Sequence, residues 1–161
     1  NALTQTQIDY IISFGEKEQL KNAEVFDREQ SEKIRKTKVA WIKEEELSKK
    51  YPLVDIITKG NKEAGWNFQL TGFEPFQYAK PYDNGLIRKL SFTLCLSDDY
   101  TGGDFELCKP NPKPDKHLYK TFELKKGTMI IFPSFVWHRV KPVTEGTRKT
   151  LVGWVVGKPF A

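Results

Sequence analysis

The chain has 161 residues, a net charge of +5 at pH 7 and a hydrophobic content of 39%. This length predicts one domain that buries about two-thirds of its unfolded surface, and the composition excludes a disordered chain. No apolar run approaches the roughly 18 residues that span a bilayer, so no membrane partner is expected. The lysines are interleaved with glutamates, which is typical of a solvated surface and does not favour nucleic-acid binding as the function. Anionic small molecules or acidic peptides fit the charge equally well.

A helix is predicted at the N-terminus, after Thr4 or Thr6 as its cap and with Gly15 as a break. Its apolar residues recur at the i, i+3, i+4 spacing of a helix that packs on a core. They are Ile8, Ile11, Ile12 and Phe14. Residues 22–33 are polar and predict a loop, and residues 34–42 have the β-branched and aromatic composition of a strand.

A second helical segment is predicted over residues 44–64. Pro52 lies near the first turn of the part of this segment with the clearer helical pattern, a position where proline is tolerated. Gly65 ends the segment. Its inward face consists of Leu53, Ile56, Ile57 and Gly60. We expect one domain over residues 1–161, with residues 1–65 as helical support for a β core at residues 66–161.

From residue 66 onward, short apolar segments alternate with Gly, Pro, Asn and Asp, which predicts a β-sandwich or jelly roll. Residues 98–103 are expected to form a hairpin connection in which glycines supply positive φ. The eight candidate strands cover residues 66–70, 73–78, 86–96, 104–108, 118–124, 128–132, 136–140 and 148–156.

The strand at residues 88–96 has two different faces, because side chains alternate along a strand. Leu90, Phe92, Leu94 and Leu96 make one face apolar. The other face carries Lys89, Ser91, Thr93 and Cys95. With helices available to cover the apolar face, the small polar face either lines a cavity or faces solvent, and both alternatives remain open here.

His138 and Arg148 are the strongest candidates for a chemical role. A neutral imidazole is the commonest metal ligand, and a guanidinium binds a carboxylate with two parallel hydrogen bonds. Arg148 shares a strand face with Trp154, where a cation is unusual without an anionic partner. The spacing of ten residues predicts that His138 and Arg148 lie on adjacent antiparallel strands, as a metal ligand beside a carboxylate clamp.

Residues 88–160 resemble the iron(II)- and 2-oxoglutarate-dependent oxygenases, in the prolyl-4-hydroxylase-like (PKHD-type) branch found in bacteria and phages. The N-terminal helices fit too, so the resemblance covers nearly the whole chain. The matching stretches include Arg88-Lys89-Leu90-Ser91, Tyr100-Thr101-Gly102-Gly103-Asp104-Phe105, Phe132-Pro133-Ser134-Phe135, His138-Arg139-Val140, Pro142-Val143-Thr144 and Gly146-Thr147-Arg148.

The resemblance implies a double-stranded β-helix (a cupin-like jelly roll) and a set of site residues. His138 is similar to the family's distal iron ligand, and Arg148 to the residue that pairs with the far carboxylate of 2-oxoglutarate. Tyr78 stands where the family has an aromatic that contacts this cosubstrate. Trp154 stands where an aromatic closes the floor of the pocket, and Thr93 and Cys95 at strand positions that face the cosubstrate.

The chain departs from the family pattern in its metal ligands. The family binds iron with two histidines and one carboxylate, of which the first half is a His-x-Asp after the strand that bears Tyr78. No histidine precedes His117, which we interpret as a loop residue. Asp83 lies in an Asp-Asn-Gly turn signature, which is favoured over a ligand role. Either the protein lacks this half, or a loop between Lys80 and Pro81 is missing from the sequence.

The resemblance implies an oxygenase that uses Fe(II), 2-oxoglutarate and O₂, with ascorbate as a reductant, to hydroxylate a C–H bond and release succinate and CO₂. The expected substrate is a peptidyl residue, proline first, with small molecules as the alternative. The expected location is the cytoplasm of a bacterium or of a phage-infected cell. Cys95 and Cys108 fit this location, because two cysteines make no disulfide framework, although a disulfide between them is a minor alternative. The competing interpretation is a catalytically inactive jelly-roll binding module that keeps an anion pocket at Arg148.

Overall fold

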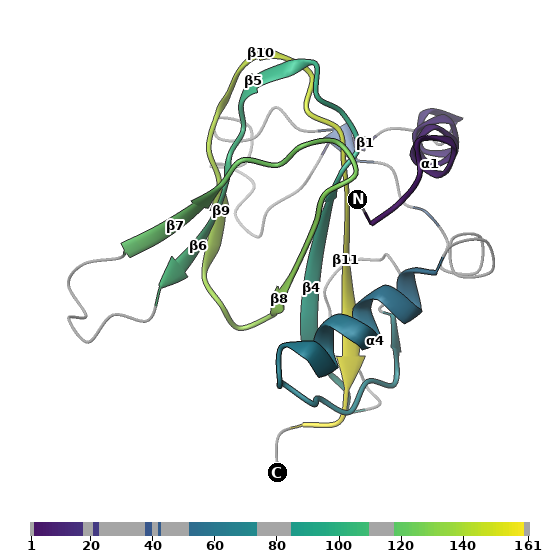
Figure 1. Ribbon diagram of the computed structural model, residues 1–161, viewed down its shortest axis with the longest axis vertical. Helices are drawn as coiled ribbons and strands as arrows, with labels where there is room; N and C mark the ends of the chain where they lie inside the picture. Colours follow the sequence, from purple (N-terminus) through teal and green to yellow (C-terminus); the bar gives the residue numbers. More distant parts are fainter. Residues whose placement is uncertain are drawn as a thin grey trace.

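The computed structural model describes residues 2–17, 21–22, 38–39, 42, 52–73, 85–109 and 118–159 (Figure 1). Two helices and eleven strands lie in these ranges, and all the strand pairs are antiparallel. The elements are α1 (Gln5–Lys17), β1 (Lys21–Asn22), β2 (Lys38–Val39), α4 (Leu53–Glu63), β3 (Gly72–Phe73), β4 (Ile87–Cys95), β5 (Tyr100–Gly102), β6 (Phe105–Lys109), β7 (Leu118–Phe122), β8 (Met129–Pro133), β9 (His138–Val140), β10 (Val143–Gly146) and β11 (Thr150–Gly157).

Helix α1 begins with a capping box. The backbone N–H of Thr4 donates to Gln7 Oε1 at 2.8 Å, and the Gln7 N–H donates to Thr4 Oγ1 at 3.4 Å. The cap at Thr4 is therefore confirmed. Gly15 does not break the helix, because the last turn continues through it to Lys17. Ile8 and Ile11 are buried, as the apolar spacing predicted.

Helix α4 follows Pro52 and buries Leu53, Ile57 and Asn61. It ends as predicted, with Gly65 at φ +69° and its N–H bonded to the Lys62 carbonyl. Asn61 explains why residues 66–70 do not form the predicted strand. Its side chain takes both backbone groups of Phe68, donating to the carbonyl at 3.0 Å and accepting from the N–H at 3.1 Å. A strand ladder would need these same two groups.

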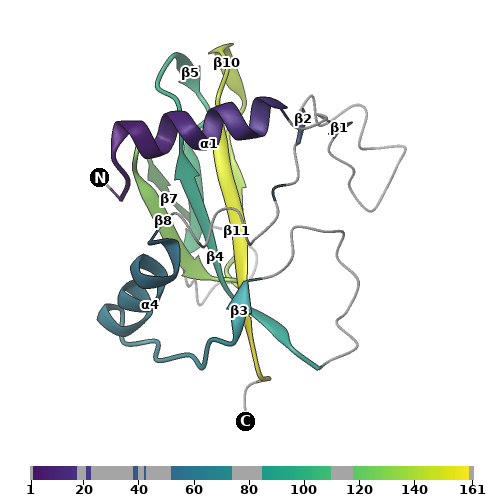
Figure 2. The same ribbon diagram turned by 90° about the vertical axis from the view of Figure 1, so that its right-hand side faces the viewer.

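The principal sheet has the strand order β3-β11-β4-β8. One face of β4 packs against both helices and forms the main core, to which β4 contributes Leu90, Phe92 and Leu94 and β11 contributes Leu151 and Val155. Figure 2 shows α1 crossing these strands near one end, with α4 farther toward the other end. Both described helices therefore contribute to the same core as β4 and β11.

A second sheet has the order β7-β6-β9, and β5 pairs separately with β10. The predicted hairpin at residues 98–103 is wrong, because β5 lies inside this segment and pairs with β10 rather than turning β4 onto β6. Gly102 and Gly103 do adopt the expected positive φ, at +77° and +66°. They direct the chain from the principal sheet to the second sheet.

The structure is mostly β with two described helices and antiparallel sheets, as predicted. The jelly roll is what the family implies; the described strands do not by themselves close one. The division of the domain at residue 65 stays a prediction. In the described part of the chain, Cys95 and Cys108 are not joined by a disulfide. None of the described helices has the length and hydropathy needed to cross a bilayer.

Candidate functional site

The second face of β4 carries the candidate pocket residues. Ser91, Thr93 and Cys95 are 4%, 4% and 0% exposed, so the interpretation that this face meets solvent is wrong. It packs instead on a smaller apolar cluster in which Cys95 and Phe132 meet Phe105 of the second sheet. Small polar side chains are therefore held between the two sheets, where a polar ligand would find hydroxyl groups in an otherwise apolar setting.

The strand register fixes the order of side chains along this buried face. Ser91 pairs with both Trp154 and Phe132, Thr93 pairs with Val152 and Ile130, and Cys95 pairs with Thr150. Ser91 and Cys95 are four residues apart, which is about 13 Å along a strand. Thr93 lies midway between these two ends.

His138 lies at the Ser91 end. It opens β9, and its ring centre lies 4.8 Å from that of Phe132 and 5.9 Å from that of Phe105. Its Nδ1 lies 3.0 Å from the Val136 carbonyl oxygen. Because a carbonyl only accepts hydrogen bonds, the neutral imidazole carries its proton on Nδ1, and the lone pair on Nε2 is left for a metal.

Arg148 lies at the Cys95 end, just before β11. Its Nη1 donates to Thr150 Oγ1 at 3.4 Å, whereas Nε and Nη2 are buried without a hydrogen-bond partner. These two nitrogens form one edge of the planar guanidinium, the edge that binds a carboxylate through two parallel hydrogen bonds. A buried donor without a partner costs about 1–3 kcal/mol. This edge of the Arg148 guanidinium therefore suits a planar anion such as a carboxylate.

His138 and Arg148 are not on adjacent strands, so that prediction is wrong. β9 pairs with β6 in the second sheet, whereas β11 pairs with β3 and β4 in the principal sheet. The ten-residue connection contains another strand, β10, which pairs with β5. The two residues therefore approach the second face of β4 from different sheets and lie at its opposite ends, with the exposed His138 near Ser91 and Arg148 near Cys95.

Gly103 supports the Arg148 side chain. A Cβ at this glycine would lie 2.8 Å from Arg148 Cδ, 3.0 Å from Val143 Cγ2 and 3.2 Å from Tyr100 Cε2. The backbone at φ +66° is itself a glycine conformation. Arg148 and Tyr100 thus pack on the same bare Cα, and any larger residue would displace the guanidinium.

Tyr100 has a role that the sequence analysis missed. Its hydroxyl oxygen lies 3.3 Å from the Leu124 carbonyl oxygen and 3.4 Å from Cys95 Sγ. Burial, followed by the contact with Cys95, raises its pKa to about 12, and a smaller opposing effect comes from the Arg148 guanidinium. The signal in the sequence is an aromatic residue two positions before Gly102-Gly103.

Trp154 is half-buried on the candidate face, but it does not lie beside Arg148. The two are six positions apart, which is about 20 Å along a strand. The cation over its ring is Arg88, whose Cζ lies 4.3 Å from the ring centre. Trp154 and Phe132 both pair with Ser91, so Trp154 lies at the His138 end of the face.

The remaining predicted site residues lie outside the described residues. These are Tyr78, Asp83, His117 and the connection between Lys80 and Pro81. Among the residues that the structure describes, no three His, Cys, Asp or Glu side chains gather in a way that could hold a metal ion. The described part of the site therefore presents an unpartnered guanidinium edge at Arg148, which suits a carboxylate, and one imidazole, at His138, of the type that binds metals.

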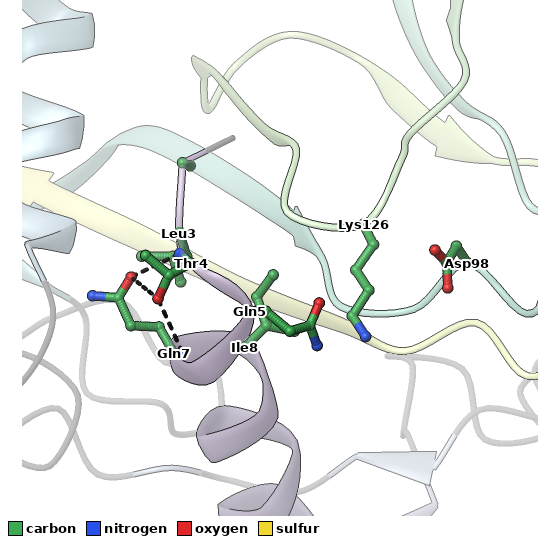
Figure 3. A pocket seen from close by; sticks show the side chains of 8 residues that line it. Leu3, Thr4, Gln5, Gln7, Ile8, Asp98 and Lys126 are labelled. Carbon is green, nitrogen blue, oxygen red and sulfur yellow. Dashed lines mark hydrogen bonds between the residues drawn. The ribbon is translucent and has the colours of Figure 1, made fainter.

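A hollow of about 530 Å³ lies elsewhere, beside the start of α1 (Figure 3). It shares no lining residue with the candidate site. Lys126 contributes to its wall and also lies 3.9 Å from Asp9. The residues that line it are Ala2, Leu3, Thr4, Gln5, Gln7, Ile8, Asp98 and Lys126.

Comparison with known proteins identifies the class that this site defines. The chain belongs to the 2OG-Fe(II) oxygenase superfamily, whose family model matches residues 68–156. The matched segment includes β4 with its buried polar face, His138 and Arg148. This confirms the resemblance found in the sequence.

Curated relatives place the chain near the PKHD-type branch. A PKHD-type hydroxylase of Hyphomonas neptunium is 34% identical over 122 residues, which cover 68% of this chain and 50% of the relative. A PKHD-type hydroxylase of Acaryochloris marina is 43% identical over 88 residues, covering 51% of this chain and 37% of the relative. The chain thus spans half or less of the length of these relatives.

Proposed function

We propose that the chain is an Fe(II)- and 2-oxoglutarate-dependent dioxygenase that hydroxylates a C–H bond. The observation that carries this proposal is the buried edge of Arg148, whose Nε and Nη2 have no partner. Two buried N–H groups of this kind are stabilised in a folded protein when a carboxylate accepts a hydrogen bond from each of them. In this family the far carboxylate of 2-oxoglutarate is the anion that such an arginine binds.

The other site residues would then contact the rest of the cosubstrate or bind the metal. Thr93 and Cys95 line the buried face next to its carbon chain, and Tyr78, outside the described residues, is proposed as a further contact. His138 would bind iron through Nε2, held in orientation by the Val136 carbonyl. Trp154 would close the same end of the site.

The metal would supply the oxidising chemistry, with O₂ as oxidant, succinate and CO₂ as co-products, and ascorbate as a reductant. Among the described residues, His138 would supply one of the three protein ligands that a two-histidine, one-carboxylate site requires. The other two would come from outside the described ranges. The chain's own contribution here is to orient the cosubstrate and to exclude water from it.

The test is 2-oxoglutarate affinity, measured by calorimetry without oxygen on the wild type and on Arg148→Ala. Loss of a charge-assisted partner should weaken binding by about 2–5 kcal/mol. Lys149→Ala is the matched control, because it removes the neighbouring cation, whose partner is Glu16 at 2.6 Å. Equal affinity in the Arg148→Ala variant and the wild type would refute the assignment.

A second candidate is a catalytically inactive binding module. It is favoured by the single iron ligand among the described residues. Both functions predict an anion at Arg148, but only the oxygenase predicts metal binding that depends on His138. If the wild type binds 2-oxoglutarate yet takes up no iron and releases no succinate, the binding module is correct.

For the substrate, we propose a peptidyl residue, with proline first. What supports it is a pair of exposed aromatic side chains, Phe135 at 67% and Trp137 at 74%, on either side of Val136. Exposed aromatic surfaces bind proline-containing peptides well. Trp137→Ala should raise the KM for a prolyl peptide and leave 2-oxoglutarate affinity unchanged; mass spectrometry would report the added oxygen. The cytoplasmic location stays a prediction.

A further inference from the structure

Tyr100 and Arg148 come from different strands and converge on one place. The ring of Tyr100 and the stem of Arg148 both lie next to Gly103, where an added Cβ would come within 3.2 Å of Tyr100 Cε2 and 2.8 Å of Arg148 Cδ. The Tyr100 hydroxyl lies at Cys95, the residue that pairs with Thr150, and Thr150 accepts the one described hydrogen bond of Arg148. A hydroxyl and a guanidinium edge are therefore presented at the same end of the buried face.

The hydrogen bond from Tyr100 to the Leu124 carbonyl is long for a hydroxyl group. The Tyr100 O–H donates to the Leu124 carbonyl over 3.3 Å, and its sulfur contact with Cys95 is 3.4 Å. The usual donor–acceptor distance for a hydroxyl group is about 2.7–2.8 Å. A carboxylate held by Arg148 would offer a charged acceptor, and hydrogen bonds to charged acceptors are roughly twice as strong.

We propose that Tyr100 is a second ligand of the anion bound by Arg148, donating its hydroxyl hydrogen to the far carboxylate of the cosubstrate. This rests on the proposed function, and it adds a contact that accounts for selectivity. Arg148 supplies two donors on one edge, and Tyr100 supplies a third from β5. An oxo acid that ends in a methyl group offers no acceptor to any of the three, so the site would select dicarboxylates.

The protonation state agrees with this role. With a pKa of about 12, the hydroxyl keeps its proton throughout the physiological range and acts as a donor to the carboxylate. A guanidinium side chain is a cation throughout this range. The two groups therefore complement one anion together at neutral pH.

The experiment measures the affinities of two ligands for three proteins. 2-Oxoglutarate and 2-oxovalerate, which lacks the far carboxylate, are titrated into the metal-loaded full chain without oxygen, using Mn(II) in place of iron. The proteins are the wild type, Tyr100→Phe and, as control, Tyr10→Phe, which removes a hydroxyl from α1, where Tyr10 stacks on Phe14. We expect Tyr100→Phe to lose about tenfold in 2-oxoglutarate affinity and nothing in 2-oxovalerate affinity.

Each outcome decides between the alternatives. If Tyr100→Phe weakens the affinity for both ligands equally, Tyr100 only supports the structure and the proposal is wrong. Unchanged 2-oxoglutarate affinity in this variant would also overturn the proposal, but it would leave the role of Arg148 intact. A wild type that binds no 2-oxoglutarate would overturn the proposed function itself. As a second measurement, 2-oxoglutarate should produce a tyrosine difference spectrum in the wild type that is missing in Tyr100→Phe; its persistence there would contradict direct contact.

Discussion

Replacing Gly103 by alanine should separate the cost of backbone strain from the cost of a displaced guanidinium. The new Cβ would lie 2.8 Å from Arg148 Cδ, about 0.6 Å short of the 3.4 Å at which ordinary contact begins. Positive φ costs a residue with a Cβ roughly 1–2 kcal/mol, offset in part by the lower entropy of the unfolded alanine chain. We expect a stability loss of about 1 kcal/mol. We also expect a loss of about tenfold in 2-oxoglutarate affinity, because the Arg148 guanidinium must move.

Gly65 provides the matched control. Its φ is +69°, close to that of Gly103, yet a Cβ there would meet nothing within 4 Å. Gly65→Ala should therefore lose similar stability, measured by urea denaturation, and keep its 2-oxoglutarate affinity, measured by calorimetry. If Gly103→Ala also keeps full affinity, Gly103 does not set the position of Arg148, and the reasoning is refuted.

Two further predictions concern stability. Glu106 accepts hydrogen bonds from Arg139 Nε at 2.6 Å and Thr121 Oγ1 at 2.8 Å, and Arg139, followed by Thr121, lowers its pKa. This contribution is present above the ordinary glutamate pKa of 4.5 and is lost as the pH falls through the lower folded value. Urea titrations should show a steeper acid loss in the wild type than in Glu106→Gln; equal slopes would argue against it. Leu94→Ala, at a fully buried position, should cost about 2–5 kcal/mol, whereas Leu118→Ala, 45% exposed, should stay within about 0.5 kcal/mol; similar losses would contradict the assignment of the core.

Local patterns predicted the elements whose stability comes from their own residues. The pair Thr4 and Gln7 marks a capping box by spacing alone, and the alternation along β4 shows which side faces the helices. Both signals are contained in a few consecutive residues. For the same reason, the apolar face of α4 and its end at Gly65 could be found without a structure.

The elements that the sequence analysis missed or misplaced depend on partners outside their own segment. Strands β5 and β10 are short, polar and exposed, so neither shows the alternation of a half-buried strand, and β10 went unnoticed between His138 and Arg148. The lost strand at residues 66–70 depends on Asn61 taking the backbone groups of Phe68. The Tyr100 ring meets the stem of Arg148 at Gly103 because β5 pairs with β10, and spacing in the sequence does not encode that pairing.

The connection between His138 and Arg148 has a consequence for how this site tolerates change. Surface connections usually accept insertions and deletions freely, but β10 is pinned to β5, and a Cβ at Gly146 would collide with the Asp99 carbonyl oxygen. One inserted residue would shift either the imidazole or the guanidinium away from its end of the buried face. The pairing of β10 with β5 therefore constrains the number of residues between His138 and Arg148, in addition to the residue type at Gly146.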